Sequence, residues 1–252
     1  MPTGYGAFCW NQLNTSDLDA SKAFYEGLLG WQILEETMGG MPMHVITTGT
    51  TMVGDVMTLP EEVKAPSHWL SYVWVQDIDR VVARAQALGA TVFVPVTEIP
   101  EVGRIAVFAD PRGAMVGVYA SAHDPASPQP SGPGTFCWFE CVTRDLEGLK
   151  AFYCDIFGWT AKTETMPGDM QYTLLHRGED QVAGMMAMEG DIWGEIPDHW
   201  MAYVAVSDIE ATVAKVEGLG GKVCVPVTDI GIGRFAVIND PVGAYVSVFQ
   251  GA

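Results

Sequence analysis

The stretch FCWNQLNTSDLDASKAFYEGLLGW at residues 8–31 decides the fold, because the chain contains it twice. Its second form, FCWFECVTRDLEGLKAFYCDIFGW, occupies residues 136–159, and the FCW, AFY and GW letters all recur 128 residues later. Further matches follow in the same order along both halves. Self-similarity that runs from end to end of a chain indicates duplication.

The later matches extend the repeat to both copies in full. They pair His68-Trp69 with His199-Trp200, Pro95-Val96-Thr97 with Pro226-Val227-Thr228, and Asp110-Pro111 with Asp240-Pro241. Between the copies, SAHDPASPQPSGPG at residues 121–134 holds four prolines and no periodic apolar pattern, which is typical of a linker. We therefore predict two domains, 1–120 and 135–252, joined by the linker 121–134.

Within each copy the pattern predicts a strand, a helix and three strands, twice over. In the first copy, Ser16 or Asp17 can cap the first helix, and Gly30 can stop it. Asp77 can cap the second helix, which Gly89 follows. The expected strands are residues 7–13, three within 32–58, and then 70–75, 91–95, 104–108 and 114–119. The second copy repeats this order, with helices expected at residues 146–157 and 209–219.

This order, with FYxxxxGW after the first helix and DPxGA before the last strand, resembles the vicinal oxygen chelate superfamily. That superfamily includes glyoxalase I, extradiol dioxygenases and bleomycin-resistance proteins, and the two-copy layout is most similar to actinobacterial members such as a mycobacterial culture-filtrate antigen. The resemblance implies an α+β fold of tandem βαβββ-βαβββ modules. They would form two open cup-shaped sheets that face each other as a pseudo-dimer within one chain.

The resemblance also implies where a metal would sit, since relatives hold Fe, Mn, Ni or Zn on inward-pointing His, Gln or Glu side chains. The three corresponding positions in the two copies are Trp10 and Trp138, Ser71 and Ala202, and Gly117 and Ser247. None of these side chains suits such a metal. Shifting the alignment by one residue supplies no metal ligand either, because the neighbouring residues include neither histidine nor carboxylate. These neighbours are Cys9, Asn11, Tyr72, Val116 and Val118. We therefore predict no metal cofactor, and an atypical site built from Glu140, His176 and His199 stays open as the alternative.

Strand alternation predicts an aromatic face in each cup. The side chains expected on it are Phe8, Trp10, Gln12, Trp69, Met115 and Tyr119 in the first copy, and Phe136, Trp138, Glu140, Trp200, Tyr245 and Phe249 in the second. Such a lining suits a flat, hydrophobic ligand. The alternative is that these rings fill a closed core.

Two further features are polar. Glu140 stands where the first copy has Gln12, so it is a candidate general base or ligand-binding carboxylate, or else a carboxylate at a wet rim. Arg104 and Arg234 follow a glycine at the start of equivalent strands. They can clamp an anionic group of a ligand or pair with an acidic neighbour.

The composition limits the classes of partner that we expect the protein to bind. Thirteen basic residues against 31 acidic ones give a net charge of −18, which disfavours nucleic acids and anionic membranes and attracts cationic small molecules. No apolar run is long enough to span a bilayer, and the N-terminus lacks the pattern of a signal peptide. The five cysteines fit reduced thiols, so we expect a cytoplasmic protein. Because the two modules would form a pseudo-dimer within one chain, we expect a monomer or a weak homodimer.

Three functions stay open at this point. The first is metal-independent binding of a hydrophobic or aromatic small molecule, as in antibiotic sequestration or natural-product handling. The second is a lyase, isomerase or oxygenase-like enzyme that acts on an aromatic or polyketide-like substrate, with Glu140 as acid or base. The third is a structural or signalling antigen whose cups are vestigial.

Overall fold

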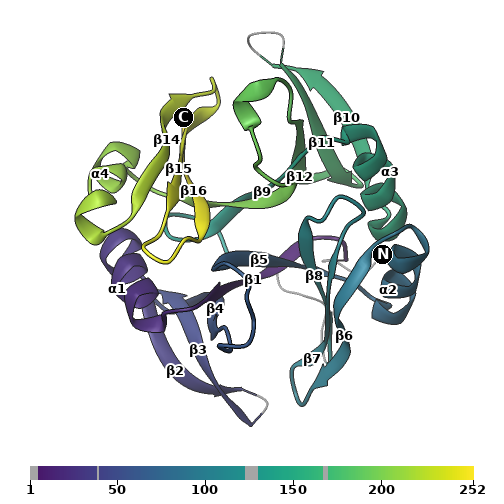
Figure 1. Cartoon of the computed structure of the whole chain (residues 1–252), viewed down its shortest axis with the longest axis horizontal. Helices are drawn as coiled ribbons and strands as arrows, with labels where there is room; N and C mark the ends of the chain where they lie inside the picture. The colour runs from purple at the N-terminus through teal and green to yellow at the C-terminus, as the bar shows by residue number, and fades with distance from the viewer. Residues whose placement is uncertain (1–4, 39, 123–129, 167–169) are drawn as a thin grey trace. The chain divides into compact units, whose positions relative to one another are not determined.

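The computed structural model describes residues 5–38, 40–122, 130–166 and 170–252. Strands β1 to β8 of the first copy form one eight-stranded mixed sheet, and β9 to β16 of the second copy form another. Neither sheet closes on itself, and Figure 1 traces the strands and helices of both copies along the chain. The predicted α+β architecture of two glyoxalase-like modules is confirmed. Most of the predicted linker, residues 123–129, lies outside the described residues.

The first copy runs β1 (Phe8–Thr15), α1 (Leu18–Leu29), β2 (Gln32–Met38), β3 (Met41–Thr48), β4 (Thr51–Thr58), β5 (His68–Trp74), α2 (Ile78–Ala87), β6 (Thr91–Ile99), β7 (Gly103–Ala109) and β8 (Met115–Ser121). The second runs β9 (Phe136–Thr143), α3 (Leu146–Phe157), β10 (Thr160–Thr165), β11 (Gln171–Arg177), β12 (Asp180–Ala187), η1 (Asp191–Trp193), β13 (His199–Ala205), α4 (Ile209–Val213), η2 (Glu217–Leu219), β14 (Lys222–Asp229), β15 (Gly233–Asn239) and β16 (Tyr245–Gly251). The order of elements agrees with the prediction.

Aspartate starts each of the helices α1 to α4. Asp17, Asp77, Asp145 and Asp208 each accept a hydrogen bond from the backbone N–H three residues on, at 3.0 Å. Such a cap satisfies one of the N–H groups that the first turn leaves unpaired. Helix α1 ends where Gly30 takes the left-handed conformation with φ 68°, which glycine adopts without steric cost.

The last helix is shorter than predicted. One helix was expected over residues 209–219, but α4 stops at Val213 and a separate 3₁₀ turn, η2, follows. Val216 and Gly218 lower helix propensity in this segment. The first copy has Ala85 and Ala87 at the equivalent positions and keeps a ten-residue α2.

The chain divides into two compact units, and each unit combines part of both sequence copies. The first unit consists of Met1–Cys9, Ser71–Pro128 and Trp138–Trp200, and the second of Trp10–Leu70, Gln129–Cys137 and Met201–Ala252. The first unit holds the ladders β5-β8-β7-β6 and β10-β11-β12-β9. The second holds β2-β3-β4-β1 and β13-β16-β15-β14.

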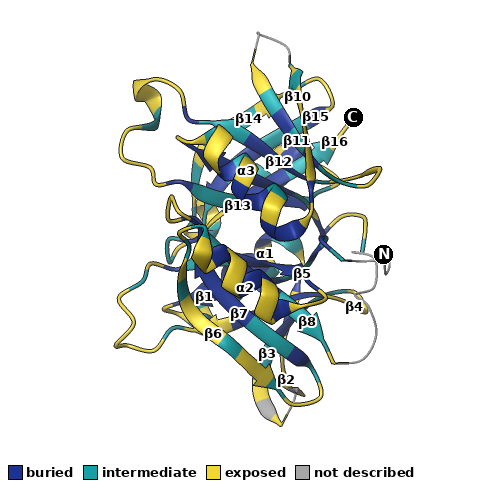
Figure 2. Cartoon of the chain, turned by 90° about the vertical axis from the view of Figure 1, so that its right-hand side faces the viewer, coloured by how far each residue is buried: buried dark blue, intermediate teal, exposed yellow. Residues whose placement is uncertain are grey.

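Each ladder is covered by a helix on one face. Helix α1 packs on β2 and β4, α2 on β6, β7 and β8, α3 on β10 and β12, and α4 on β14, β15 and β16. The helices are amphipathic, and Figure 2 shows their outward surfaces exposed next to buried strands. The face of each ladder that is turned away from its helix is therefore the face on which a ligand site can form.

A hydrogen-bonded chain of Trp, Tyr and Asp joins the copies within the first unit. Trp200 Nε1 donates to the Tyr153 hydroxyl at 2.8 Å, and Tyr153 donates to Asp110 Oδ2 at 2.6 Å. Asp110 also accepts the backbone N–H groups of Arg112 and Ala114. Because Tyr153 belongs to the second copy and Asp110 to the first, the FY and DP motifs complete each other across the duplication.

The second unit places the same three residue types together with the copies exchanged, but Asp240 Oδ2 has no hydrogen-bond partner among the described residues, so the bonded chain is complete in the first unit only. Trp69 Nε1 donates to the Tyr25 hydroxyl at 2.8 Å, and Asp240 accepts the backbone N–H groups of Val242 and Ala244. Burial raises the pKa of Tyr25 well above its usual range, and the Asp240 carboxylate raises it further. The Tyr25 hydroxyl therefore stays protonated next to a carboxylate.

The tryptophans of the two GW motifs also donate hydrogen bonds from one copy to the other. Trp159 Nε1 donates to the Gly6 carbonyl at 2.7 Å, and Trp31 Nε1 donates to the Gly134 carbonyl at 2.8 Å. Each glycine precedes the first strand of the other copy.

Among the described residues, no helix is long and apolar enough to cross a membrane.

We predict that Tyr153→Phe lowers the free energy of unfolding by about 1–3 kcal/mol, because it leaves the buried Asp110 and the half-buried Trp200 without their shared partner. Urea denaturation followed by tryptophan fluorescence measures this change. Tyr245→Phe is the matched control, since Tyr245 is 53% exposed. An unfolding midpoint of Tyr153→Phe equal to that of the control would show that the hydrogen bonds among Trp200, Tyr153 and Asp110 do not stabilise the fold.

Candidate functional site

A buried carboxylate lies on the face of β1 and β4 turned away from α1. Trp10 Nε1 donates to Asp55 Oδ1 at 2.6 Å, and Gln12 Nε2 donates to Asp55 Oδ2 at 2.9 Å. The parallel register places Gln12 directly beside Asp55. The Asp55 side chain is therefore fixed by two neutral donors, and the residue is only 2% exposed.

Burial raises the pKa of the Asp55 carboxyl above its usual range, and the bonds from Gln12 and Trp10 oppose this shift without cancelling it. A carboxylate that is desolvated and held by neutral groups is costly in its charged form. A cation brought next to Asp55 would remove that cost. The position is thus suited to bind a positively charged or strongly donating group.

The surface around Asp55 is largely apolar. The register aligns Leu34, Val45 and Asp55 across β2, β3 and β4, so their side chains share one face. Two residues further along β4, Met57 lies on the same face by alternation. Leu34 is 46% exposed and Met57 47% exposed, so apolar surface lies open beside the carboxylate.

Asn14 adds an unused donor to this face. It follows Gln12 by two residues on β1 and pairs with Met57 in the register. Asn14 is 6% exposed, and its Nδ2 has no hydrogen-bond partner among the described residues. Buried polar groups are nearly always paired, so this amide is a candidate for contact with a ligand.

The second copy places its carboxylate on the other strand. Trp138 Nε1 donates to the Tyr172 hydroxyl at 2.9 Å, and Tyr172 donates to Glu140 Oε2 at 2.7 Å. Glu140 is 8% exposed, so it is not a carboxylate at a wet rim. Gly184 pairs with Glu140 as Asp55 pairs with Gln12, and a Cβ at Gly184 would overlap the Tyr172 hydroxyl.

Asp55 and Tyr172 were not singled out from the sequence. The signal was available, because the aligned copies put Asp55 opposite Gly184 and Tyr172 opposite Met43. Such exchanges between otherwise similar copies mark positions where the copies have different chemistry. The predicted asymmetry of Gln12 and Glu140 is one half of this exchange.

The positions that correspond to the relatives' metal ligands do not fit a metal. Tyr72, not Ser71, pairs with Gly117, so Ser71 and Gly117 point to opposite faces, and Tyr203 in the same way pairs with Ser247. A Cβ at Gly117 would overlap the Tyr72 ring. Among the described residues, no three His, Cys, Asp or Glu side chains come close enough to hold an ion, and this includes Glu140, His176 and His199.

The remaining aromatic residues lie mainly in packing clusters. Phe8 stacks on Phe139 with ring centroids 4.0 Å apart, and Phe136 packs against Trp31 and Trp69. Both phenylalanines are 3% exposed. For Phe8 and Phe136 the structure therefore agrees with the core interpretation.

The prediction that Trp69 shares the aromatic face of the cup with Met115 and Tyr119 was wrong. Met115 and Tyr119 share a face with Gly117, whose partner on β5 is Tyr72, whereas Trp69 lies on the other face of β5 and bonds to Tyr25. Trp200 has the same role beside Tyr153. The Tyr119 hydroxyl donates to the Val102 carbonyl, and in the second unit Tyr245 and Phe249 lie on the same face of β16 as Ser247.

Both arginines are held by acidic neighbours. Arg104 makes two bonds to Asp79, at 2.6 and 2.8 Å, and Arg234 bonds to Glu210 at 3.2 Å and to Gln250 at 2.9 Å. The Nδ1 atoms of His68 and His199 lie 2.8 Å from the carbonyls of Pro66 and Pro197, so each ring is held by the loop before its strand. Of the polar side chains considered, Asp55 and Glu140 are the carboxylates that are buried and bonded to neutral groups of the same face.

Comparison with known proteins gives one family. A family model described as the Glyoxalase/Bleomycin resistance protein/Dioxygenase superfamily matches residues 8–118 and again 136–248. The protein CFP32 of Mycobacterium tuberculosis is 33% identical over 248 residues, which cover 96% of this chain and 94% of the relative. The anthracycline biosynthesis protein DnrV of Streptomyces peucetius is 29% identical over 259 residues, which cover 97% of this chain and 93% of the relative.

Solved structures agree in fold. The Mn(II)-bound glyoxalase from Novosphingobium aromaticivorans superposes with a TM-score of 0.66 at 15% identity and covers 98% of this chain and 82% of its own. A catechol 2,3-dioxygenase superposes with a TM-score of 0.64 at 12% identity and covers 97% of this chain and 87% of its own. At such identities the likeness extends to the fold alone.

We predict that Asp55→Asn makes the fold more stable at pH 7. The pKa of Asp55 is raised in the folded state, so the unfolded chain ionises first, and the wild type loses stability as the pH rises through that pKa. The advantage of the variant should therefore shrink as the pH is lowered through the same pKa. Urea unfolding across a pH series measures this stability difference. The fold should tolerate the change, because the asparagine oxygen can still accept from Trp10 while its amide donates to the oxygen of a rotated Gln12 side chain.

Asp79→Asn is the control, because the Arg104 guanidinium lowers the pKa of the exposed Asp79 carboxyl. This variant should show no gain at pH 7. An Asp55→Asn protein that is less stable than the wild type at neutral pH would contradict a desolvated carboxylate.

Proposed function

Because the chain belongs to the Glyoxalase/Bleomycin resistance protein/Dioxygenase superfamily, we propose that it binds a hydrophobic, aromatic small molecule that carries a cationic amine, without a metal ion. The observation that carries this proposal is the buried Asp55 carboxylate, held by Trp10 and Gln12 and set in apolar surface. Such a site can bind an antibiotic or another natural product without a reactive centre.

The apolar part of the ligand has a matching surface. Leu34 and Met57 are exposed on the same face as Asp55, and methionine adapts its shape to irregular ligands. The Trp10 indole is half-buried next to the carboxylate and offers a flat surface for stacking. These three side chains favour a ring system over a small polar metabolite.

The polar part of the ligand is matched by one acceptor and one donor. Asp55 accepts from an amine or hydroxyl, and the unpaired Asn14 Nδ2 can donate to a carbonyl on the same molecule. A burial cost that the free protein carries at both groups is relieved when the ligand binds. This pairing gives the site selectivity for aromatic compounds with an amine or hydroxyl near a carbonyl.

The relatives support the same class of compound. DnrV, and DauV of Streptomyces sp. strain C5, are both named for anthracycline biosynthesis. Anthracyclines are polycyclic aromatic compounds, and many carry an amino sugar. We therefore take an anthracycline as the probe for this site.

We predict that an anthracycline binds more tightly than its aglycone, which lacks the amino sugar. Asp55→Asn should remove most of this difference, about tenfold or more in Kd, because a charge-assisted bond is lost. Affinity of the wild type for the amine should rise with pH through the raised pKa of Asp55, since only the ionised carboxyl attracts the cation. Quenching of tryptophan fluorescence measures both effects.

Lys22→Gln, a change on the exposed surface of α1, serves as the control and should leave both affinities unchanged. Equal affinities for the amine and the aglycone in the wild type would remove the proposed role of Asp55. Absence of binding to either compound would count against the proposal as a whole.

A second function rests on a different observation, the bond from Tyr172 to Glu140 in the first unit. A buried carboxylate paired with a tyrosine hydroxyl can move a proton to and from a bound substrate. The protein would then be a lyase, isomerase or oxygenase-like enzyme, with Glu140 as the acid or base. Its substrate would belong to the same aromatic, polyketide-like class.

Under this second function Glu140→Gln should lower turnover of the anthracycline about 10²–10⁴-fold while binding stays intact. The glutamine oxygen can still accept from Tyr172, so the fold should be kept. Liquid chromatography with mass spectrometry detects the product. Turnover that survives the substitution, or a wild type that forms no product, would leave binding as the function.

A further inference from the structure

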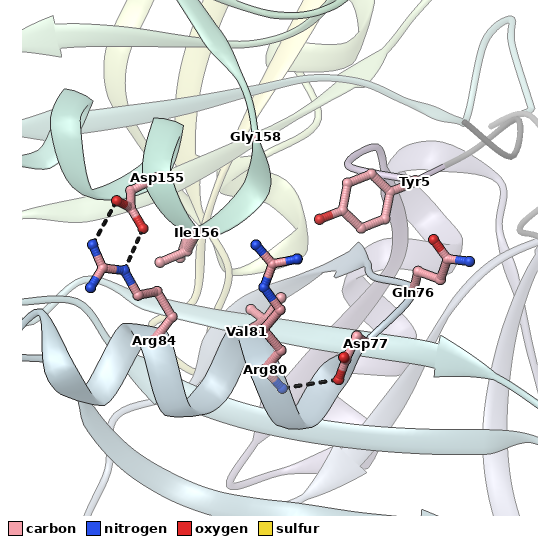
Figure 3. Close-up of a pocket in the computed structure, with 9 residues that line it drawn as sticks. All are labelled: Tyr5, Gln76, Asp77, Arg80, Val81, Arg84, Asp155, Ile156 and Gly158. Atoms are coloured by element: carbon pink, nitrogen blue, oxygen red, sulfur yellow. Dashed lines mark hydrogen bonds and ion pairs between the residues drawn. The ribbon is translucent and has the colours of Figure 1, made fainter.

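Helices α2 and α3 of the first unit are joined by a paired guanidinium and carboxylate. Arg84 donates to both oxygens of Asp155, at 2.7 and 2.8 Å. This interaction lowers the pKa of Asp155 and raises that of Arg84. The two helices lie side by side in Figure 1, and Figure 3 shows Arg84 and Asp155 reaching toward each other from them.

A pocket of about 370 Å³ opens next to this pair, as Figure 3 shows. Tyr5, Val81 and Ile156 form its apolar walls, and Arg80 extends from α2 into it. The Tyr5 hydroxyl is turned toward the Arg80 guanidinium in this view. The volume falls in the range of pockets that take small molecules, about 300–1,000 Å³.

The Arg80 guanidinium makes no hydrogen bond or ion pair with another described residue. The two acidic residues that line the same pocket accept hydrogen bonds from other groups, although the Arg80 charge helps to lower the pKa of Asp155. Asp155 is held by both bonds from Arg84, and Asp77 Oδ1 accepts from the backbone N–H of Arg80 itself at 3.0 Å. In a chain with a net charge of −18, an arginine without such a partner is unusual.

The second unit has a different arrangement at the equivalent helices. Ala211 stands where the first copy has Arg80, and Gly27 stands where the second copy has Asp155. A Cβ at Gly27 would press against the Leu219 side chain, so α1 and η2 pack closely there. The guanidinium and the carboxylate pair are therefore particular to the first unit, and the duplicated fold does not require them.

We propose that this pocket binds a small organic carboxylate, separate from the site at Asp55. Arg80 presents a planar fork of donors that matches both oxygens of a carboxylate. The Tyr5 hydroxyl can donate a further bond to the same group, and the ring or chain of the ligand packs against Val81 and Ile156. The Arg84–Asp155 pair holds the two helices at the spacing that keeps the pocket open.

Titration of the full-length protein with benzoate tests this proposal, followed by the backbone and arginine Nε–Hε signals in nuclear magnetic resonance spectra. We expect saturable shifts that include Arg80 and neighbouring residues of α2. Arg80→Ala introduces the residue of the second copy at an exposed helical position, so it should fold, and it should weaken benzoate binding about tenfold or more. Arg80→Lys keeps the charge without the planar fork and should fall between the two.

Lys150→Ala is the matched control, because it removes one positive charge from α3 outside the pocket. It should bind benzoate as the wild type does. Shifts that do not saturate, or equal weakening by Arg80→Ala and Lys150→Ala, would overturn the proposal. Inorganic phosphate that binds more tightly than benzoate would overturn the choice of a carboxylate ligand.

Discussion

The structure depends on a buried tyrosine that donates to an aspartate of the other copy. In the first unit Tyr153 accepts from Trp200 and donates to Asp110, and in the second unit Tyr25 accepts from Trp69 and lies near the Asp240 carboxylate, which raises the pKa of Tyr25. A buried carboxylate without its donors is costly, so neither copy completes its own core. The two GW tryptophans, which donate to glycine carbonyls before the first strands, add the same requirement. The motifs that identify the family are thus explained by packing between copies.

This constraint leaves the helix-free faces of the ladders available for function. In the second unit the face of β1 and β4 carries Asp55, fixed by Trp10 and Gln12. In the first unit the equivalent face of β9 and β12 carries Glu140, fixed by Tyr172. The duplication kept one carboxylate and one indole in each copy but moved the carboxylate to the neighbouring strand. The two units therefore present different polar groups on corresponding faces.

The sequence predicted the order of strands and helices well, because caps such as Asp17 and stops such as Gly30 act locally. It predicted the wrong face for Trp69, since the pairing of Tyr72 with Gly117 is a parallel register between strands more than 40 residues apart, which local alternation does not determine. Asp55 and Tyr172 lie outside the positions that correspond to the metal ligands of relatives, so the resemblance does not point to them. A comparison of the two copies position by position would have found both. Phe8 and Phe136 were expected to line a ligand site, and they pack in aromatic clusters instead.

The central claim is that the carboxylates serve an organic ligand directly, with no ion between. Native mass spectrometry of the protein as purified, with elemental analysis of the same sample, tests this claim most directly. We predict that less than stoichiometric Fe, Mn, Ni or Zn accompanies the protein, and that a retained aromatic compound adds mass to it under gentle conditions. One metal ion for each chain, lost together with ligand binding when Asp55 or Glu140 is replaced, would contradict the account.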